Sequence, residues 1–88
     1  MFEARIKFNE VPKDLGEVIS RYPAYQESGE GKWTWRSGLG NVDVEIVPES
    51  DSACLRVYTE RGGLTAQARV STLALSIGKH YNANVSWI

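Results

Sequence analysis

The alternation of apolar and polar residues between Lys32 and Glu60 limits the possible folds more than any other feature of the sequence. A period of two places successive side chains on opposite faces of a strand, so each alternating run predicts a strand with one buried and one wet face. Two stretches rich in Gly, Ser, Asn, Asp and Pro interrupt the alternation and predict turns. The pattern therefore predicts a three-stranded antiparallel meander, with strands at residues 32–36, 42–46 and 55–60.

Alternation recurs at both ends of the chain. From Glu3 to Phe8 every second residue is apolar, which predicts a first strand. Val85 and Trp87 share one face of a short last strand. The segment 26–31, with the sequence QESGEG, is polar and contains two glycines, so we expect a loop there.

Two segments have the apolar period of a helix instead. In the first, the spacing is i, i+3, i+4 and i+7, given by Leu15, Val18, Ile19 and Tyr22. We expect this helix to open at Val11-Pro12, because proline fits a first helical turn, and to stop at Pro23. The second helix is predicted from about Leu64 to Tyr81, with Asn82 closing it.

The predicted element order is β-α-β-β-β-α-β. A chain of 88 residues has room for one hydrophobic core, so residues 1–88 are predicted to form a single domain. Two helices on one face of a mostly antiparallel sheet make an α+β fold of the two-layer sandwich type. The three Trp residues are predicted to lie under the helices with Phe8 and Leu55. If the hairpin at 32–47 projects past the helices, Trp33 and Trp35 form an exposed aromatic pair instead.

The sheet face opposite the helices, here called the open face, is predicted to stay in contact with water. Alternation assigns ten residues to it, namely Arg5, Lys7, Thr34, Arg36, Asp43, Glu45, Arg56, Tyr58, Glu60 and Ser86. Sheets that bind single-stranded RNA expose two or three aromatic rings among basic residues. Tyr58 is the one aromatic residue of this set, and carboxylates accompany it, so the open face is a poor candidate for base stacking.

The charge balance disfavours nucleic acid as the partner. Ten Lys and Arg residues against eleven Asp and Glu give a net charge of −1, whereas a general nucleic-acid binder needs an excess of positive charge. The charges are unevenly placed, because residues 43–60 are acidic and residues 61–88 are basic. Such a dipole can steer a charged partner. No apolar stretch approaches the roughly 20 residues of a membrane span, and no signal-peptide pattern opens the chain, so we expect a cytoplasmic protein with no membrane partner.

Few residues are suited to catalysis or metal binding. Cys54 is the one cysteine and His80 the one histidine, which is too few for a structural zinc site. Neither residue has a catalytic partner near it in the sequence, so we expect a non-catalytic protein without a metal or cofactor. The alternative is a small enzyme in which Cys54 is the nucleophile. A nucleophilic thiol needs a base nearby, and His80 is the residue that could serve.

Arg61-Gly62-Gly63 directly precedes the long predicted helix. Backbone N–H groups at a helix N-terminus, together with an Arg, can hold a phosphate or a carboxylate. The segment lacks the Lys and Ser or Thr of a P-loop, and a plain strand-to-helix turn explains the two glycines equally well. A nucleic-acid or anionic-ligand binder that uses this segment with Arg69 and Lys79 is the alternative to the function below.

The function predicted from these features is that of a non-catalytic protein-binding module. The partner-binding residues are predicted on the acidic hairpin and the open face, namely Arg36, Asp43, Glu45, Glu49, Asp51, Arg56, Tyr58 and Glu60. A small acidic domain without a recognisable catalytic site is similar to many phage-encoded inhibitors of host machinery, which suggests a host defence complex as the partner. A last strand ending at Ile88 is a candidate exposed edge, so a homodimer is a further expectation.

A resemblance to a known family adds to this interpretation. Ala4-Arg5-Ile6 lies near the start of the sequence and Val85-Ser86-Trp87 near its end, and a long predicted helix ends at His80 just before the last strand. In these features it resembles a bacterial family of short α+β domains of unknown function, found alone or fused behind siderophore-interacting reductases. The segment from His80 to Ala83 departs from the aromatic-rich segment of that family. The resemblance implies a shared element order over the whole length and assigns no functional residue.

Overall fold

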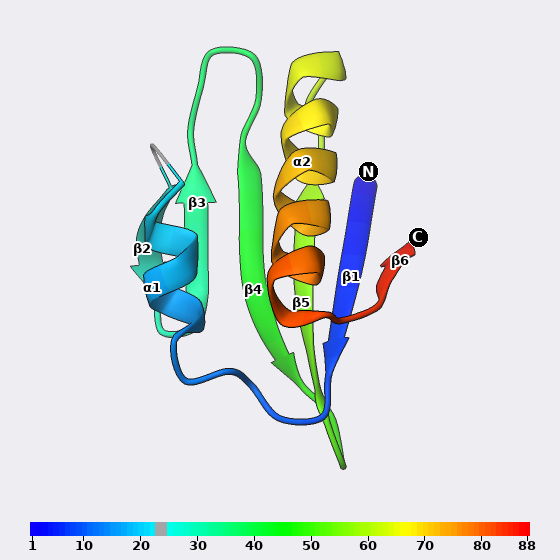
Figure 1. The fold of residues 1–88 in the computed structure, drawn as a ribbon. Coiled ribbons are helices and arrows are strands. Elements are labelled where there is room, and N and C mark those ends of the chain that lie inside the picture. The colour runs from blue at the N-terminus through cyan, green and yellow to red at the C-terminus, as the bar shows by residue number, and fades with distance from the viewer. Residues whose placement is uncertain (23–24) are drawn as a thin grey trace.

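The computed structural model describes residues 1–22 and 25–88, which form six strands and two helices. Their bounds, in chain order, are β1 Phe2–Phe8, α1 Leu15–Ser20, β2 Tyr25–Gly29, β3 Lys32–Trp35, β4 Val42–Pro48, β5 Ala53–Thr59, α2 Leu64–Tyr81 and β6 Val85–Trp87. The strands form one sheet in the order β2-β3-β4-β5-β1-β6, and every neighbouring pair is antiparallel. Both helices lie on the same face of this sheet, α1 near β2 and β3 and α2 across β5 and β1 (Figure 1). The predicted two-layer α+β sandwich is therefore confirmed.

The sheet contains a strand at Tyr25–Gly29 where the sequence predicts a loop. This strand, β2, pairs with β3, and Gly31 turns the chain between them with a φ of +68°. Tyr25 at the start of β2 is buried, whereas residues 26–28, which alternate between the two faces of the sheet, are all exposed on this edge strand. Three exposed polar residues in succession give no apolar alternation, so the periodicity signal is absent there.

The predicted bounds are right for one helix and partly wrong for the other. Helix α2 has the predicted bounds, and Asn82 ends it with a left-handed φ of +52°, as expected of a closing residue. Helix α1 starts at Leu15 instead of at Val11-Pro12, because the N–H of Leu15 bonds the carbonyl of Pro12 in a separate turn. Pro23, the expected end of this helix, lies outside the described residues. No described helix is long and apolar enough to cross a membrane.

The core lies between the helices and the sheet. Trp33 and Trp35 are 5% and 8% exposed, so their predicted core position is confirmed, as it is for Phe8 and Leu55. Trp87 is 47% exposed, and the prediction that it lies under a helix is wrong. It projects from the same face as its cross-strand neighbour Ala4, but β6 is the outermost strand and lies at the border of α2.

This division predicts the fluorescence of the three Trp residues. In dilute protein, acrylamide should quench one component of the emission, that of Trp87, and leave the blue-shifted emission of Trp33 and Trp35 nearly unchanged, because a buried indole does not meet the quencher. Stern–Volmer titrations of the wild type and of Trp87→Phe measure this, and the variant should lose the quenchable component. A quenchable component that persists in Trp87→Phe would contradict the core position of the other two rings.

Candidate functional site

The open face of the sheet carries polar side chains in rows set by the strand register. One row crosses β3, β4 and β5 at Thr34, Asp43 and Tyr58 and continues to Glu3 on β1. The next row contains the residues Lys32, Glu45, Arg56, Arg5 and Ser86, in strand order from β3 to β6. Directly opposed residues on neighbouring antiparallel strands are in contact range, so each row is a line of side chains that can pair.

Arg56 lies at the centre of these rows and forms ion pairs with two carboxylates. Its Nη1 donates to Glu45 Oε1 at 2.5 Å, and its Nη2 donates to Glu3 Oε1 at 2.8 Å. The other oxygen of Glu3 accepts a bond from Nε of Arg5. We call these four residues, Glu3, Arg5, Glu45 and Arg56, the Arg56 network. An arginine that bridges two carboxylates from neighbouring strands fixes the side chains as well as the charges.

The burial of Glu3 makes this network different from a surface ion pair. The Glu3 residue is only 4% exposed, although it lies on the uncovered face. The hydrogen bond from Arg56 holds the pKa of the Glu3 carboxyl below its usual value of 4.5, and burial opposes that shift. The same bond raises the pKa of Arg56 above its ordinary range. A buried carboxylate that keeps its charge depends on its partners. The Arg56 network therefore contributes to the stability of the fold, although it lies on the open face.

The lowered pKa of Glu3 has a consequence for acid stability. The unfolded chain takes up a proton on this carboxyl at a higher pH than the folded chain does, so the stability that it contributes is complete above pH 4.5 and is lost as the pH falls through the folded pKa. We therefore expect Glu3→Gln to be less stable than the wild type at neutral pH and to lose less stability in acid. Urea unfolding of both proteins from neutral pH to below pH 4.5 measures the difference. The control is Glu60→Gln, which removes an exposed carboxylate outside the Arg56 network. If the unfolding free energies of Glu3→Gln and Glu60→Gln depend on pH in the same way, the role given to Glu3 is contradicted.

Around the network, the open face offers groups that can meet a partner. Tyr58 lies under the guanidinium of Arg56, whose Cζ is 4.2 Å from the ring centre, and burial with nearby carboxylates raises the pKa of its phenol. The hydroxyl of Thr34 lies 3.0 Å from Oδ1 of Asp43 and donates to it. A surface with a stacked Tyr–Arg pair and charges of both signs is suited to contact with a protein.

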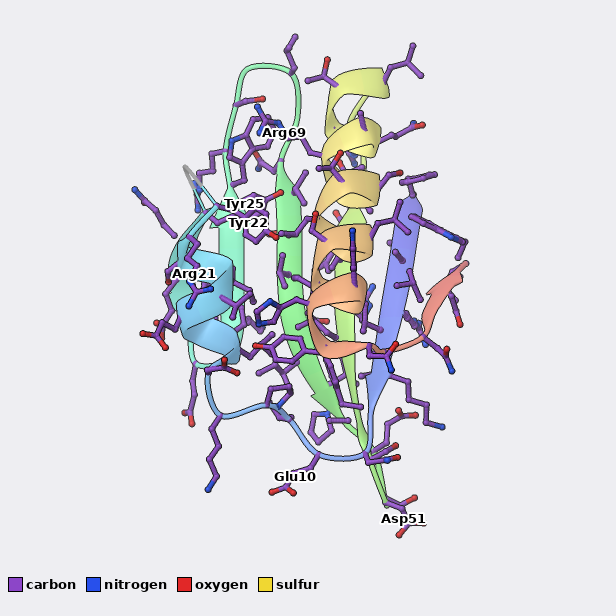
Figure 2. The ribbon with its side chains drawn as sticks, viewed as in Figure 1. Glu10, Arg21, Tyr22, Tyr25, Asp51 and Arg69 are labelled. Atoms are coloured by element: carbon purple, nitrogen blue, oxygen red, sulfur yellow. The ribbon has the colours of Figure 1, made fainter. Side chains whose placement is uncertain are left out.

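The predicted partner-binding residues separate into three places. Asp43, Glu45, Arg56 and Tyr58 come together at the centre of the open face. Arg36 directly follows Trp35, the last residue of β3, and Glu60 directly follows Thr59, the last residue of β5. Both are exposed at this end of the sheet. Glu49 and Asp51 lie in the β4–β5 turn at the opposite end of the sheet, where Figure 2 shows Asp51 at the tip.

Two members of the Arg56 network are not among the partner-binding residues predicted from the sequence, although alternation assigns Arg5 to the open face. Glu3 and Arg5 enter because β1 pairs with β5, which places Glu3 opposite Tyr58 and Arg5 opposite Arg56. The alternation of β1 shows that both residues are on the wet face, but it does not show which strand is the neighbour. A pairing between residues more than fifty positions apart leaves no local pattern in the sequence.

The Arg61-Gly62-Gly63 segment has a structural explanation. A Cβ at Gly62 would lie 2.3 Å from both Ala66 Cβ and Thr59 Oγ1, so the residue is glycine because the turn packs tightly. The N–H of Gly62 already donates to Thr59 Oγ1 at 3.0 Å. The neighbouring hollow of about 370 Å³ is lined by the carboxylates of Asp43 and Glu60 as well as by Arg61. These contacts describe a strand-to-helix turn in mixed-charge surroundings.

The other candidate groups do not converge. Cys54 lies with Arg5 and Arg56 around one hollow of the open face, whereas His80 is exposed on α2, on the other side of the sheet. Cys54 is 8% exposed, and burial raises the pKa of its thiol, which is the reverse of nucleophile activation. Among the residues the structure describes, no three His, Cys, Asp or Glu side chains gather to hold a metal ion.

The basic residues of α2 are also spread. The guanidinium of Arg69 stacks 4.8 Å from the centre of the Trp35 ring, on the flank of α2 that faces β2 and Tyr25 (Figure 2). Lys79 is exposed ten residues later, about 15 Å along the helix at a rise of 1.5 Å per residue. Arg61 precedes the other end of α2. The three cations therefore do not form one patch.

Comparisons of this chain with protein-family models, with curated proteins and with solved structures find no match.

Proposed function

We propose that this chain is a non-catalytic protein-binding module whose open sheet face docks against a partner protein. The observation that carries the proposal is the Arg56 network, which holds the centre of an uncovered sheet face in one arrangement of paired charges. Groups that are already fixed lose little conformational entropy on binding, so a rigid charged face is better suited to recognition than a mobile one. Complementary charges on a partner then supply specificity and a fast association rate.

A narrower proposal concerns the kind of partner. The small size, the net charge of −1 and the acidic segment 43–60 support an inhibitor that covers a basic surface of a host complex, a defence complex in a phage-infected cell. In this form of the proposal the partner surface is basic and faces Asp43 and the exposed carboxylates Glu49 and Glu60. The bound partner loses activity because its own binding surface is covered.

The test is capture of the partner by a face variant and a matched control. Asp43→Lys with Arg36→Glu reverses two charges of the open face, keeps the net charge and leaves the Arg56 network intact. Glu17→Lys with Arg21→Glu does the same on the exposed surface of α1, on the other side of the sheet. Tagged proteins are incubated with source or host lysate, eluted in a salt gradient and analysed by mass spectrometry after their melting temperatures have been matched.

We expect one stoichiometric protein to be retained by the wild type and by the α1 control and to be lost from the face variant. Retention by all three proteins would remove the open face from the proposal. A captured species that is sensitive to nuclease would favour the nucleic-acid alternative, and the absence of any captured species would contradict a protein-binding module. Inhibition of the purified partner by the wild type, but not by the face variant, tests the narrower proposal.

A further inference from the structure

Strand β6 presents a free hydrogen-bonding edge at the end of the sheet. The N–H of Ile88 donates to the carbonyl of Glu3 at 3.0 Å, and the N–H of Lys7 donates to the carbonyl of Asn84 at 3.3 Å. In an antiparallel ladder, alternate residues direct their main-chain groups to the partner strand. Ser86 therefore faces β1, while Val85 and Trp87 direct their N–H and C=O groups away from the sheet. No described segment lies beyond β6 in the strand order.

The two edges of the sheet differ in how they are protected. The β2 edge has a register shift between Glu27 and Gly29, and Glu27 is exposed on it. An irregular strand with an exposed charge resists pairing with another strand. The β6 edge, Val85–Trp87, has no charged residue and no proline, and its register against β1 is regular.

Apolar side chains lie beside the free edge on the helix side of the sheet, whereas Arg5 lies beside Ser86 on the open face. Trp87 packs on the ring of Phe2 with 5.9 Å between the centroids, and it remains 47% exposed. Leu75, 54% exposed, lies on α2 one turn before Gly78, the helix residue that lies against Val85. An apolar strip of this kind beside unpaired main-chain groups is a typical interaction surface.

We propose that the β6 edge binds the β6 edge of a second copy of this chain, which forms a dimer with one continuous sheet. In an antiparallel pairing about a two-fold axis, Ser86 stands opposite Ser86 of the second copy, and Val85 stands opposite Trp87. This register pairs all the outward main-chain groups of Val85 and Trp87. It also places Trp87 against an apolar residue, on the face of the sheet that the helices share.

A second copy fits this edge because the edge carries no charge that a symmetric pairing would oppose. Neither Val85 nor Ser86 nor Trp87 carries a charge, so the two-fold register opposes no like charges. The pairing closes after two copies, since the outer edges of the dimer are the two protected β2 edges. The strand has only three residues, so we expect a reversible dimer whose population depends on concentration.

A charge-swap experiment tests the contact at the two-fold axis. Ser86 is exposed on the open face beside Arg5, so Ser86→Glu and Ser86→Lys should both fold, which circular dichroism and thermal melting verify. Each variant alone opposes two like charges across the axis and should raise the dimer Kd by roughly fivefold in sedimentation equilibrium. An equimolar mixture of the two variants should regain a dimer at least as tight as the wild type, because Glu then faces Lys.

Ser28→Glu and Ser28→Lys place the same charges on the exposed face of β2 and should leave the Kd unchanged. Trp87 quenching provides an independent readout, since acrylamide should reach this residue less readily as the wild type is concentrated. A wild type that stays monomeric at the highest soluble concentration overturns the proposal. A dimer whose Kd is equally insensitive to Ser86 and to Ser28 charges also overturns it.

Discussion

Replacement of Arg56 with methionine should lower the free energy of unfolding by about 3 kcal/mol, because it leaves a buried carboxylate without its main partner. Glu3 is 4% exposed, and its hydrogen bond with Arg56 is the main cause of its lowered pKa. Arg5 still contacts Glu3 in this variant, which limits the loss. Urea unfolding followed by far-UV circular dichroism measures the effect, and the slope with denaturant should stay unchanged.

Two variants make this result specific to the Arg56 network. Arg36→Met removes an exposed arginine outside the network and should change the stability by less than about 0.5 kcal/mol. Glu3→Gln combined with Arg56→Met removes the buried charge together with its partner, so it should be more stable than Arg56→Met alone. A loss for Arg56→Met as small as that for Arg36→Met would show that the network contributes no more than a surface ion pair.

Trp33→Ala should lower the free energy of unfolding by about 3–5 kcal/mol, the usual range for a large aromatic ring removed from a core. Trp33 is 5% exposed, and its ring lies against Gly16 of α1, where a Cβ would be 3.5 Å from the ring edge. Helix α1 has only six residues and cannot stay helical without the sheet beneath it. We therefore expect amide exchange to accelerate most in residues 15–20.

Trp87→Ala is the matched control for the Trp33 prediction. It removes the same side chain from a site that is 47% exposed, so the loss in dilute protein should be a fraction of that for Trp33→Ala. Equal losses for the two variants would contradict the division of the Trp residues between core and edge.

Periodicity predicts the strands that have one dry and one wet face. The apolar alternation of β1, β3, β4 and β5 is visible because α1 and α2 cover one face of these strands. Residues 26–28 of β2 have no such contrast, so the sequence predicts a loop there. The start of α1 was also misplaced, because Pro12 is as compatible with a separate turn as with a first helical turn.

The candidate site was partly predictable for a related reason. Asp43, Glu45, Arg56 and Tyr58 are on strands joined by a short turn, so alternation alone places them together on the open face. The place of Glu3 depends on β1 pairing with β5, and that pairing is a property of the whole sheet. Its ion pairs with Arg5 and Arg56 depend on the same pairing, which no spacing in the sequence reveals.

The order of strands in the sheet also determines when the chain can fold. Strand β1 pairs only with β5 and β6, whereas β2 to β5 pair with their neighbours in sequence. During synthesis β1 emerges first and has no partner until residues 53–59 have left the ribosome, while pairing between distant segments is slow because the intervening chain must be ordered. The pairing therefore allows the meander β2–β5 to form before β1 joins it, and α2 and β6 come after β5 in the chain.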